Sequence, residues 1–307
     1  MVATGRAASP DQWTFGPLGL AFADYSSSRS QAISRAEEHT MSQDPFARLK
    51  VRQREMWASF GPTAMFTTPV AAHLVKFAGI TAGEKVLDVG TGTGVVAITA
   101  ARAGAHVTAL DLTPELLEQA RDNARIAQRD DIVWTEGDAE DLPYADAAFD
   151  VVVSQFGHMF GPRPDVVMAQ MRRVLKPGGR VAFATWPPEH WVGRMFAFVG
   201  RNSPPPPPGA APPPQWGNPT IVTERLSAGF DAPFFERGTM PFPALSIAHY
   251  RAFMERSVGP MQKLVESLAA EPARLSALRA EFDALVAPYY EDNVVRSGYL
   301  LTRAMAR

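Results

Sequence analysis

The sequence predicts an α/β protein with an open parallel sheet that helices cover on both faces. Three observations carry this prediction. Five short apolar segments alternate with segments of helical periodicity between residues 86 and 186. A glycine-rich turn follows the first apolar segment, and a long helical stretch lies between two further strand patterns near the C-terminus. Apolar strands that alternate with helices are typical of parallel sheets with right-handed crossover connections.

The strand and helix patterns follow one another without a break. The segments expected to form buried strands are residues 86–90, 106–111, 132–138, 149–155 and 180–186. The helical segments between them are residues 95–103, 114–128 and 165–176. Gly104 is expected to end the first helix, and Thr113 and Pro114 to cap and begin the second. The Pro-Gly-Gly run at residues 177–179 is expected to end the third.

The N-terminal part of the chain divides into two segments. Residues 1–43 are rich in Ala, Ser and Gly without a sustained period, which predicts a disordered extension. Residues 44–80 carry apolar side chains at steps of three and four, and we expect Pro62 and Pro69 to separate two helices there. These helices and the alternating segments together make a predicted core over residues 44–190.

The organisation changes after this core. Residues 191–220 are interpreted as a proline-rich loop insertion, with a ligand segment for a proline-recognising domain as the alternative. Residues 221–307 are expected to hold the last strands, 234–244 and 297–306, with helical residues 246–287 between them. Such an insertion predicts a lid over the carboxyl edge of the sheet, where ligands of open α/β sheets bind.

Composition excludes several classes of protein. The 307 residues include no cysteine, so a disulfide framework, a thiolate zinc site and a cysteine nucleophile are ruled out. The formal charge of −2 gives no basic footprint for nucleic acid. The six histidines show no HxH or HxxxH spacing, so no metal is expected. No apolar run is long enough for a membrane helix, and we expect a cytoplasmic protein with no stable membrane insertion.

The segment VLDVGTGTG at residues 86–94 indicates a ligand-binding turn. Its glycines allow a tight turn and a close approach of a ligand to the backbone. Dinucleotide-binding proteins also place such a turn after their first strand, but their third glycine would fall at position 95, which is Val95. Asp88 at the strand end disfavours a pyrophosphate. A cofactor without phosphate and with a cationic amino-acid part fits better, and an NAD(P)-dependent oxidoreductase remains an alternative.

Polar residues also follow the next three strands. Asp111 lies 23 residues after Asp88, where a carboxylate can accept both hydroxyls of a ribose. Asp138 follows the third strand and can accept a hydrogen bond from an adenine amino group. Ser154 and Gln155 end the fourth strand. Because the carboxyl ends of parallel strands meet at one edge, these residues are expected to surround one ligand.

The chain resembles a known family at these positions. The segments VLDVGTGTG, ALD, EGDAEDLPYADAAFDVVVSQFG and RRVLKPGGRVAFATW are similar to class I S-adenosylmethionine-dependent methyltransferases. The resemblance is strong over residues 50–190 and favours the small-molecule group that includes ubiquinone and menaquinone C-methyltransferases. It implies a doubly wound, seven-stranded, mostly parallel sheet of the Rossmann-like methyltransferase fold, with a helical lid. It also implies that the last strand, residues 297–306, is antiparallel.

The resemblance implies that S-adenosyl-L-methionine is the cofactor. The residues that would bind it are Asp88, Gly90, Thr91, Gly92, Thr93, Asp111, Leu112, Asp138, Ala139 and Ser154. The glycine turn would line the methionine and ribose, with Asp88 behind it. Asp111 would hold the ribose, and the adenine would lie between Leu112, Asp138 and Ala139. Ser154 would lie under the cofactor near the transferring methyl group.

The implied reaction is an in-line displacement at a sulfonium methyl group, for which the protein mainly aligns a nucleophile and excludes water. His158, just after the fourth strand, is our candidate base or substrate contact. The alternative is a loop histidine that packs among Phe156, Met159 and Phe160.

Further aromatic and basic residues are candidates for the mouth of the site. They are His190, Trp186, Trp191, Arg54 and Trp57. The apolar residues of the tail, such as Phe242, Phe253, Met254 and Met261, form either the core of the lid or a pocket for a substrate. In the second case the substrate is a hydrophobic or aromatic small molecule. The alternative to a methyltransferase of this kind is a non-catalytic cofactor-binding or interaction protein on the same fold. The oligomeric state is left open.

Overall fold

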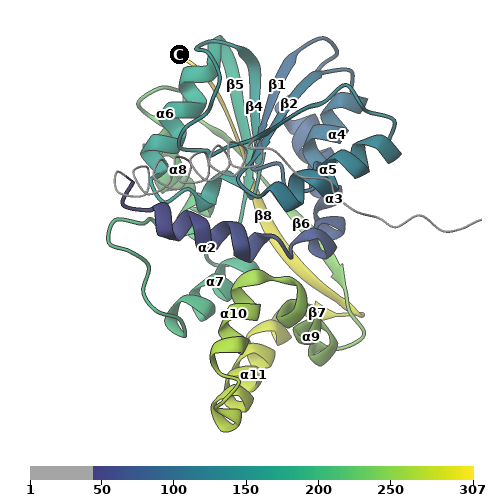
Figure 1. Cartoon of the computed structure of the whole chain (residues 1–307), viewed down its shortest axis with the longest axis vertical. Coiled ribbons are helices and arrows are strands. Elements are labelled where there is room, and N and C mark those ends of the chain that lie inside the picture. Colours follow the sequence, from purple (N-terminus) through teal and green to yellow (C-terminus); the bar gives the residue numbers. More distant parts are fainter. Residues whose placement is uncertain (1–43) are drawn as a thin grey trace, which may run out of the picture. The chain divides into compact units, whose positions relative to one another are not determined.

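The computed structural model describes residues 44–307 and centres on one sheet with the strand order β3-β2-β1-β4-β5-β8-β6 (Figure 1). Its strands are β1 Lys85–Val89, β2 His106–Asp111, β3 Val133–Glu136, β4 Phe149–Gln155, β5 Leu175–Thr185, β6 Phe234–Pro243, β7 Tyr290–Glu291 and β8 Val294–Met305. The pairs from β3 to β5 are parallel, and β8 runs antiparallel to β5, β6 and the short β7. The predicted mostly parallel sheet with an antiparallel last strand is confirmed, and the two-residue β7 is an addition to it.

Helices lie on both faces of this sheet. The α-helices are α2 Ala47–Trp57, α3 Gly61–Ala78, α4 Val95–Arg102, α5 Pro114–Ile126, α6 Pro164–Val174, α7 Trp191–Arg201, α8 Pro219–Leu226, α9 Ile247–Ser257, α10 Gly259–Ser267 and α11 Pro272–Val286. Three short 3₁₀ turns are η1 His158–Phe160, η2 Pro213–Gly217 and η3 Ala287–Tyr289. The strand order steps away from β1 in both directions, so crossovers of one hand place α4 and α5 on one face and α6 on the other.

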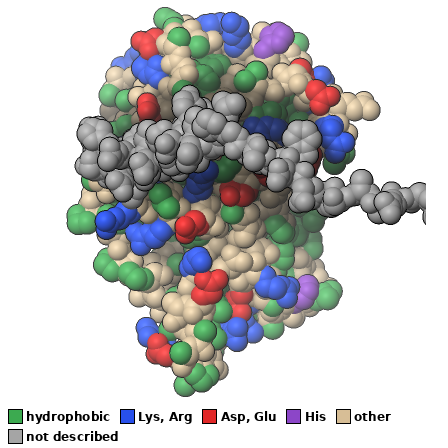
Figure 2. All heavy atoms as spheres, in the orientation of Figure 1, with side chains coloured by type: hydrophobic (Ala, Val, Ile, Leu, Met, Phe, Trp, Pro, Cys, Tyr) green, Lys and Arg blue, Asp and Glu red, His purple; other side chains and the backbone are tan. Residues whose placement is uncertain are grey.

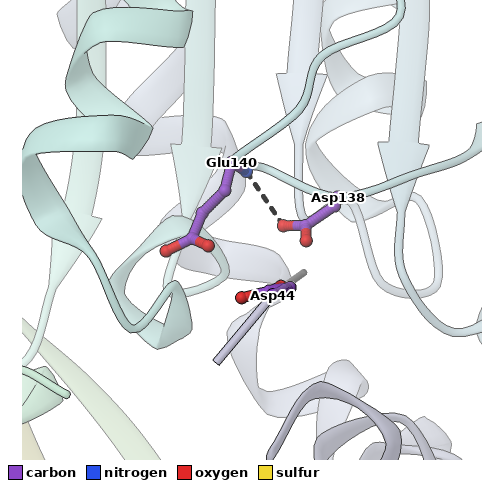
Figure 3. Close-up of side chains that lie close together, drawn as sticks. All are labelled: Asp44, Asp138 and Glu140. Carbon is purple, nitrogen blue, oxygen red and sulfur yellow. Dashed lines mark hydrogen bonds between the residues drawn. The ribbon is translucent and has the colours of Figure 1, made fainter. Parts of the chain in front are cut away.

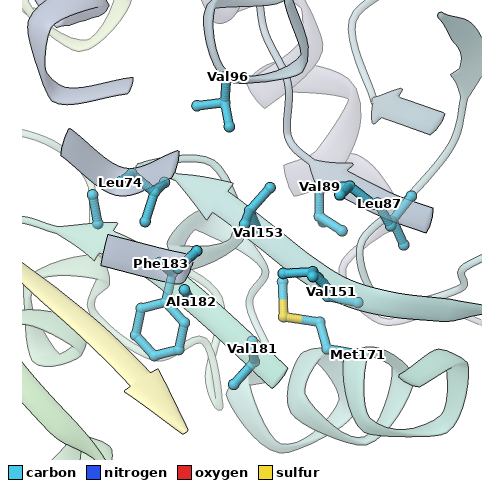
Figure 4. Close-up of a cluster of buried hydrophobic side chains, with 14 of the residues drawn as sticks. Leu74, Leu87, Val89, Val96, Val151, Val153, Met171, Val181, Ala182 and Phe183 are labelled. Carbon is cyan, nitrogen blue, oxygen red and sulfur yellow. The ribbon is translucent and has the colours of Figure 1, made fainter. Parts of the chain in front are cut away.

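The main hydrophobic core lies between the sheet and its helices (Figure 4). Leu87 of β1, Val153 of β4 and Phe183 of β5 are fully buried, and Leu74 of α3 packs against the same cluster. These strands are covered on both faces, which is why their sequences are continuous apolar runs rather than alternating ones. The core therefore fixes the strands whose carboxyl ends carry the polar residues singled out above.

A second hydrophobic cluster belongs to the C-terminal helices. We call α7, α9, α10 and α11 the lid. Trp191, Phe198 and Phe282 are fully buried there, and Tyr250 and Phe242 pack with them. Trp191 Nε1 donates a hydrogen bond of 2.7 Å to the hydroxyl of Tyr250. The predicted helical lid thus has a core of its own.

Two predicted helix boundaries are wrong. Pro69 lies inside α3, which runs unbroken from Gly61, so only the residues before Gly61 separate the first two helices. Proline has no N–H group, so the helix carbonyl four residues before Pro69 lacks its usual hydrogen-bond donor. The side chain of Pro69 is exposed, and solvent on this side of the helix can hydrogen-bond to that carbonyl. α6 ends at Val174, and the Pro-Gly-Gly run lies within β5, where the register with β4 shifts. Gly178 has a φ of +71°, so it supports this irregularity.

The proline-rich range holds more regular structure than its composition predicts. Residues 191–220 begin with the helix α7 and contain η2 near their end. Trp216 of η2 is buried against the main core. The predicted extension at residues 1–43 lies outside the described residues. Within residues 44–307 no helix combines the length and the apolar character needed to cross a membrane.

We predict that Pro69→Ala stabilises the protein. Alanine restores a backbone donor in the interior of α3, where proline costs up to about 3 kcal/mol, so the free energy of unfolding should rise by about 1–3 kcal/mol. Pro62→Ala is the matched control, because Pro62 lies in the first turn and replaces no intrahelical donor. Urea unfolding of both variants measures the difference. Equal effects of the two substitutions would contradict the role assigned to Pro69.

Candidate active site

One large pocket lies at the carboxyl ends of the parallel strands. The loops after β1 to β4 form one part of its wall, and α2, η1 and the lid form the rest. The residues from the strand ends are Gly90, Gly92, Asp111, Leu112, Thr113, Gly137, Asp138, Ala139, Gln155, Phe156 and Gly157. The strands of the sheet thus bring together Gly90, Gly92, Asp111, Leu112, Asp138 and Ala139 of the predicted cofactor residues.

The glycine turn after β1 lies against the turn after β4. Gly90 has a φ of +68°, and a Cβ there would lie 2.7 Å from Cα of Gly157. Gly92 has a φ of +56°, and a Cβ there would meet nothing within 4 Å. Gly90 is therefore required by the contact between two loops, whereas Gly92 borders open space in the pocket and lets a ligand reach the backbone.

Asp88 lies behind this turn, as expected from the resemblance. It is fully buried, and its Oδ2 accepts hydrogen bonds from Thr91 Oγ1 at 2.6 Å and from Ala97 N at 3.1 Å. Burial raises the pKa of Asp88 to about 7, because desolvation outweighs these two hydrogen bonds. Thr91 and Thr93, the other two residues of the turn expected to line the methionine and ribose, are buried and do not line the pocket.

Asp111 faces the pocket from the end of β2. Its Oδ2 accepts a hydrogen bond of 2.7 Å from Gly92 N, and its Oδ1 accepts one of 2.9 Å from Thr113 N. Burial raises its pKa. A carboxylate has about four lone-pair positions, so two remain for a ligand after these backbone bonds. This arrangement fits a vicinal diol such as that of a ribose.

The loop after β3 carries a pair of carboxylates (Figure 3). Asp138 Oδ1 accepts a hydrogen bond of 2.9 Å from Glu140 N, and its Oδ2 lies 2.7 Å from Lys50 Nζ. Lys50 also lies 2.7 Å from Glu140, which in turn pairs with Arg163. Asp138 is therefore oriented by the protein before any ligand binds. Lys50 was missed in the sequence, because its contacts with Asp138 and Glu140 join segments far apart in the chain.

Helix α2 forms the roof over this part of the pocket. Gln53 Nε2 donates a hydrogen bond of 3.0 Å to the carbonyl of Phe160, and the ring of Trp57 lies 4.7 Å from that of Phe160. Lys50, Gln53 and Trp57 line the pocket. Arg54, expected at the mouth, instead pairs with Glu136 at 2.9 Å.

The predicted role of Ser154 is wrong. Its side chain is fully buried and does not line the pocket. Ser154 Oγ donates to the carbonyl of Val89 at 2.6 Å and accepts from His158 N at 3.0 Å. It therefore joins the end of β1 to η1, which is a structural role. Successive side chains of a strand face opposite sides, and Gln155 is the residue that faces the pocket.

The predicted role of His158 as a base is also wrong. The side chain is fully buried and away from the pocket, with its ring 4.5 Å from Phe183 and 4.7 Å from Trp216. Neither ring nitrogen has a hydrogen-bond partner within residues 44–307. Burial, and then the charge of Arg225, lower the pKa of His158 to about 3. The packed interpretation holds, but with Phe183 and Trp216 as neighbours in place of the expected Phe156, Met159 and Phe160.

The remaining wall of the pocket is mostly apolar, with a few hydroxyl groups. It includes the expected Trp186, Phe242 and Met254, and the lining residues missed in the sequence include Thr63, Thr67, Met195, Phe196, Met240, Tyr250 and Ser297. Trp191, Phe253 and Met261 pack in the lid, and His190 lies beside Arg237. The helical periodicity of the tail could not show which of its apolar residues face inward.

Comparisons with known proteins agree with this geometry. A family model described as a methyltransferase domain matches residues 87–183. Two uncharacterized proteins of Mycobacterium tuberculosis are similar to nearly the whole chain. One is 34% identical over 255 residues, which is 82% of this chain and 93% of that protein. The other is 32% identical over 265 residues, or 84% of this chain and 96% of that protein. The chain belongs to the methyltransferase-domain family.

More distant relatives share parts of this methyltransferase. Demethylmenaquinone methyltransferase of Tropheryma whipplei is 43% identical over 108 residues, which is 34% of this chain and 43% of that enzyme. A crystal structure of a Bacillus halodurans protein named as a candidate methyltransferase has the same fold, with a TM-score of 0.55 and 22% identity. That match covers 76% of this chain and 97% of the other. The fold is therefore that of class I methyltransferases.

We predict that Asp88→Asn changes the pH dependence of stability. Native Asp88 keeps its proton up to about pH 7, whereas an unfolded aspartate loses it near pH 4, so this group destabilises the native state as pH rises between these values. The wild-type slope from one such group reaches about −1.4 kcal/mol per pH unit. In urea unfolding from pH 4.5 to 8, the free energy of unfolding of the variant minus that of the wild type should therefore rise with pH up to about pH 7. Asp122→Asn removes an exposed carboxylate of α5 and controls for loss of charge. Parallel profiles of Asp88→Asn and wild type would refute the shift.

We predict the opposite dependence for His158. Its lowered pKa means that the unfolded chain takes up a proton near pH 6.5 while the native state does not, so stability is lost as pH falls below that value. His158→Phe removes this loss and should be more stable than wild type at pH 4.5, relative to pH 7.5, in thermal unfolding. Binding of S-adenosylhomocysteine at pH 7.5 should be unchanged. A profile with the wild-type slope would contradict the buried neutral imidazole.

Proposed function

We propose that the protein is an S-adenosylmethionine-dependent methyltransferase that acts on a small hydrophobic or aromatic molecule. The observation that carries the proposal is the continuity of one pocket. At one end it has Asp111, Asp138 and the glycine turn, and at the other it has aromatic and methionine side chains from β6, the lid and Trp186 just after β5. A nucleoside cofactor and an apolar substrate can thus meet without leaving the pocket.

The cofactor end supports S-adenosylmethionine on three counts. Two lone-pair positions of Asp111 are available for the ribose, and Leu112 and Ala139 offer apolar surface for an adenine. Gly92 borders open space, so the methionine part can lie against the backbone of the turn. A structure of Haemonchus contortus phosphoethanolamine N-methyltransferase 2 contains S-adenosylhomocysteine on this fold, with a TM-score of 0.50 and 16% identity.

The substrate end favours an uncharged, apolar acceptor. Trp186, Met240, Phe242, Tyr250 and Met254 line it, and such surroundings select by shape and by a few polar groups. Acidic and basic side chains are interspersed over the face shown in Figure 2, without a continuous basic stripe. This supports a small molecule rather than nucleic acid as the partner. A cytoplasmic location and the absence of stable membrane insertion remain part of the proposal.

Bound S-adenosylmethionine would supply an activated methyl group on a sulfonium. The chain then has to bind both molecules, align them and exclude water, and positioning of this kind can lower a barrier by about 7–11 kcal/mol. α2 and the lid contribute side chains to the pocket wall, which supports a role for them in limiting the access of water. Because His158 is buried away from the pocket, no step in the proposal depends on it.

Two other functions make different predictions. An NAD(P)-dependent oxidoreductase would place a pyrophosphate at the glycine turn, and Asp88 and Val95 disfavour it. A non-catalytic protein on this fold would bind the cofactor without transferring its methyl group. A binding measurement distinguishes the methyltransferase from the oxidoreductase, because the two bind different cofactors. A measurement of methyl transfer distinguishes it from the non-catalytic protein.

We expect S-adenosylhomocysteine, and not NADH, to stabilise the protein. At about 100 times its dissociation constant a ligand adds about 2.7 kcal/mol, which is several degrees in the unfolding temperature. Asp111→Ala removes hydrogen bonds to a charged group that are worth about 1.5–3 kcal/mol, so affinity should fall about 10-fold to 150-fold by calorimetry. Asp122→Ala, on the exposed side of α5, is the control. A shift with NADH alone would overturn the proposal, and binding without methyl transfer to any acceptor would favour the non-catalytic alternative.

A further inference from the structure

Gln155, the last residue of β4, lies on the pocket wall with its side-chain amide held in one orientation. Its Nε2 donates a hydrogen bond of 3.1 Å to the carbonyl oxygen of Thr67 in α3. A carbonyl oxygen can only accept, so this bond determines which end of the amide is the nitrogen. The other end, Oε1, is buried and has no partner within residues 44–307. Gln155 and Thr67 both line the pocket.

An unpaired buried acceptor is costly, so it calls for an explanation. Leaving such a group without a partner costs about 1–3 kcal/mol. The described part of the chain has other buried polar atoms without partners, on Asp88, Tyr144, His158, Trp216, Arg225, Asp283 and Thr302. None of those residues lines the pocket, whereas Gln155 does. Its free oxygen is therefore placed where a ligand can supply the missing donor.

The surroundings of Gln155 are uncharged. Trp186 stacks on Phe156 with ring centroids 3.7 Å apart, and Met240 and Phe242 complete this part of the wall. The lining side chains that carry charge, namely Lys50, Asp111 and Asp138, come from α2 and from the ends of β2 and β3, on the other side of β1. Burial raises the pKa of Tyr250, which keeps its proton and accepts a hydrogen bond from Trp191. Among the pocket-lining residues that the structure describes, no charged side chain comes from the elements around Gln155 to pair with an ionised substrate.

We propose that Gln155 selects the methyl acceptor by accepting a hydrogen bond from an O–H or N–H group of an uncharged, mainly apolar molecule. This inference rests on the proposed function. Gln155 immediately precedes the loop in which Gly157 touches Gly90, so it stands at the junction of the cofactor end and the substrate end. An amide oxygen does not take up a proton near neutral pH. Gln155 is accordingly a positioning and specificity residue and not a base.

Matched aromatic probes test the proposal on protein saturated with S-adenosylhomocysteine. 2-Naphthol carries an O–H donor, 2-methoxynaphthalene has the same rings without a donor, and 2-naphthoate carries a charge. Calorimetry on the wild type should show 2-naphthol binding about 5-fold to 150-fold more tightly than 2-methoxynaphthalene. This ratio corresponds to the free-energy cost of leaving one buried acceptor without a hydrogen bond. 2-Naphthoate should bind most weakly.

Gln155→Met should abolish the preference for 2-naphthol and keep the affinity for S-adenosylhomocysteine. The unfolding temperature of the ligand-free variant should be equal to or higher than that of the wild type, because the variant loses an unpaired acceptor. A merely structural role predicts a lower unfolding temperature. Gln119→Met, at an exposed glutamine of α5 outside the pocket, is the control and should keep the preference.

Several outcomes would overturn the assignment of Gln155. They are equal binding of the two neutral probes, a preference that survives in Gln155→Met, tightest binding of 2-naphthoate, or no binding of any probe to protein that holds S-adenosylhomocysteine. Failure of the wild type to bind S-adenosylhomocysteine would instead overturn the proposed function. The two failures are therefore distinguishable.

Discussion

The contact between the turn after β1 and the turn after β4 is the constraint on which the site depends. A Cβ on Gly90 would lie 2.7 Å from Cα of Gly157, so both turns need glycine to come this close. Their contact sets the floor of the pocket at the centre of the sheet. Asp111 then reaches the turn from β2 through its bond to Gly92, and Gln155 precedes it on β4. The cofactor end and the substrate end both take their position from this pair of glycines.

Burial away from water changes the pKa values of two side chains in opposite directions. Asp88 is buried with two hydrogen bonds, yet its pKa rises to about 7. His158 is buried with no hydrogen-bond partner among residues 44–307, and burial lowers its pKa to about 3. Burial disfavours the charged form in both cases. The same low polarity makes the free oxygen of Gln155 costly in the ligand-free protein and valuable to a donor on a ligand.

Much of the fold, and the edge of the sheet where the pocket lies, could be predicted from the sequence. Strand ends and glycine turns are determined by the backbone preferences of neighbouring residues, and these can be read from the sequence. Asp111 and Gly92 are where their positions in the pattern put them. Ser154 was wrongly assigned because successive side chains of a strand face opposite sides. His158 was wrongly assigned because it lies in the turn η1 with its ring packed beside Phe183 and Trp216. Lys50 and Thr67 escaped notice because their contacts join elements far apart in the chain, and periodicity within one helix carries no information on them.

The two hydrophobic clusters have a consequence for how this protein and its relatives diverge. One cluster holds the sheet and the cofactor turn, and the other holds the lid. Substitutions on the inner face of the lid can therefore reshape half of the pocket while the cofactor half keeps its packing. The match to demethylmenaquinone methyltransferase, confined to about a third of this chain, agrees with such separable inheritance. Because the lid has buried side chains of its own, its pocket-facing residues are freer to change than those of the sheet.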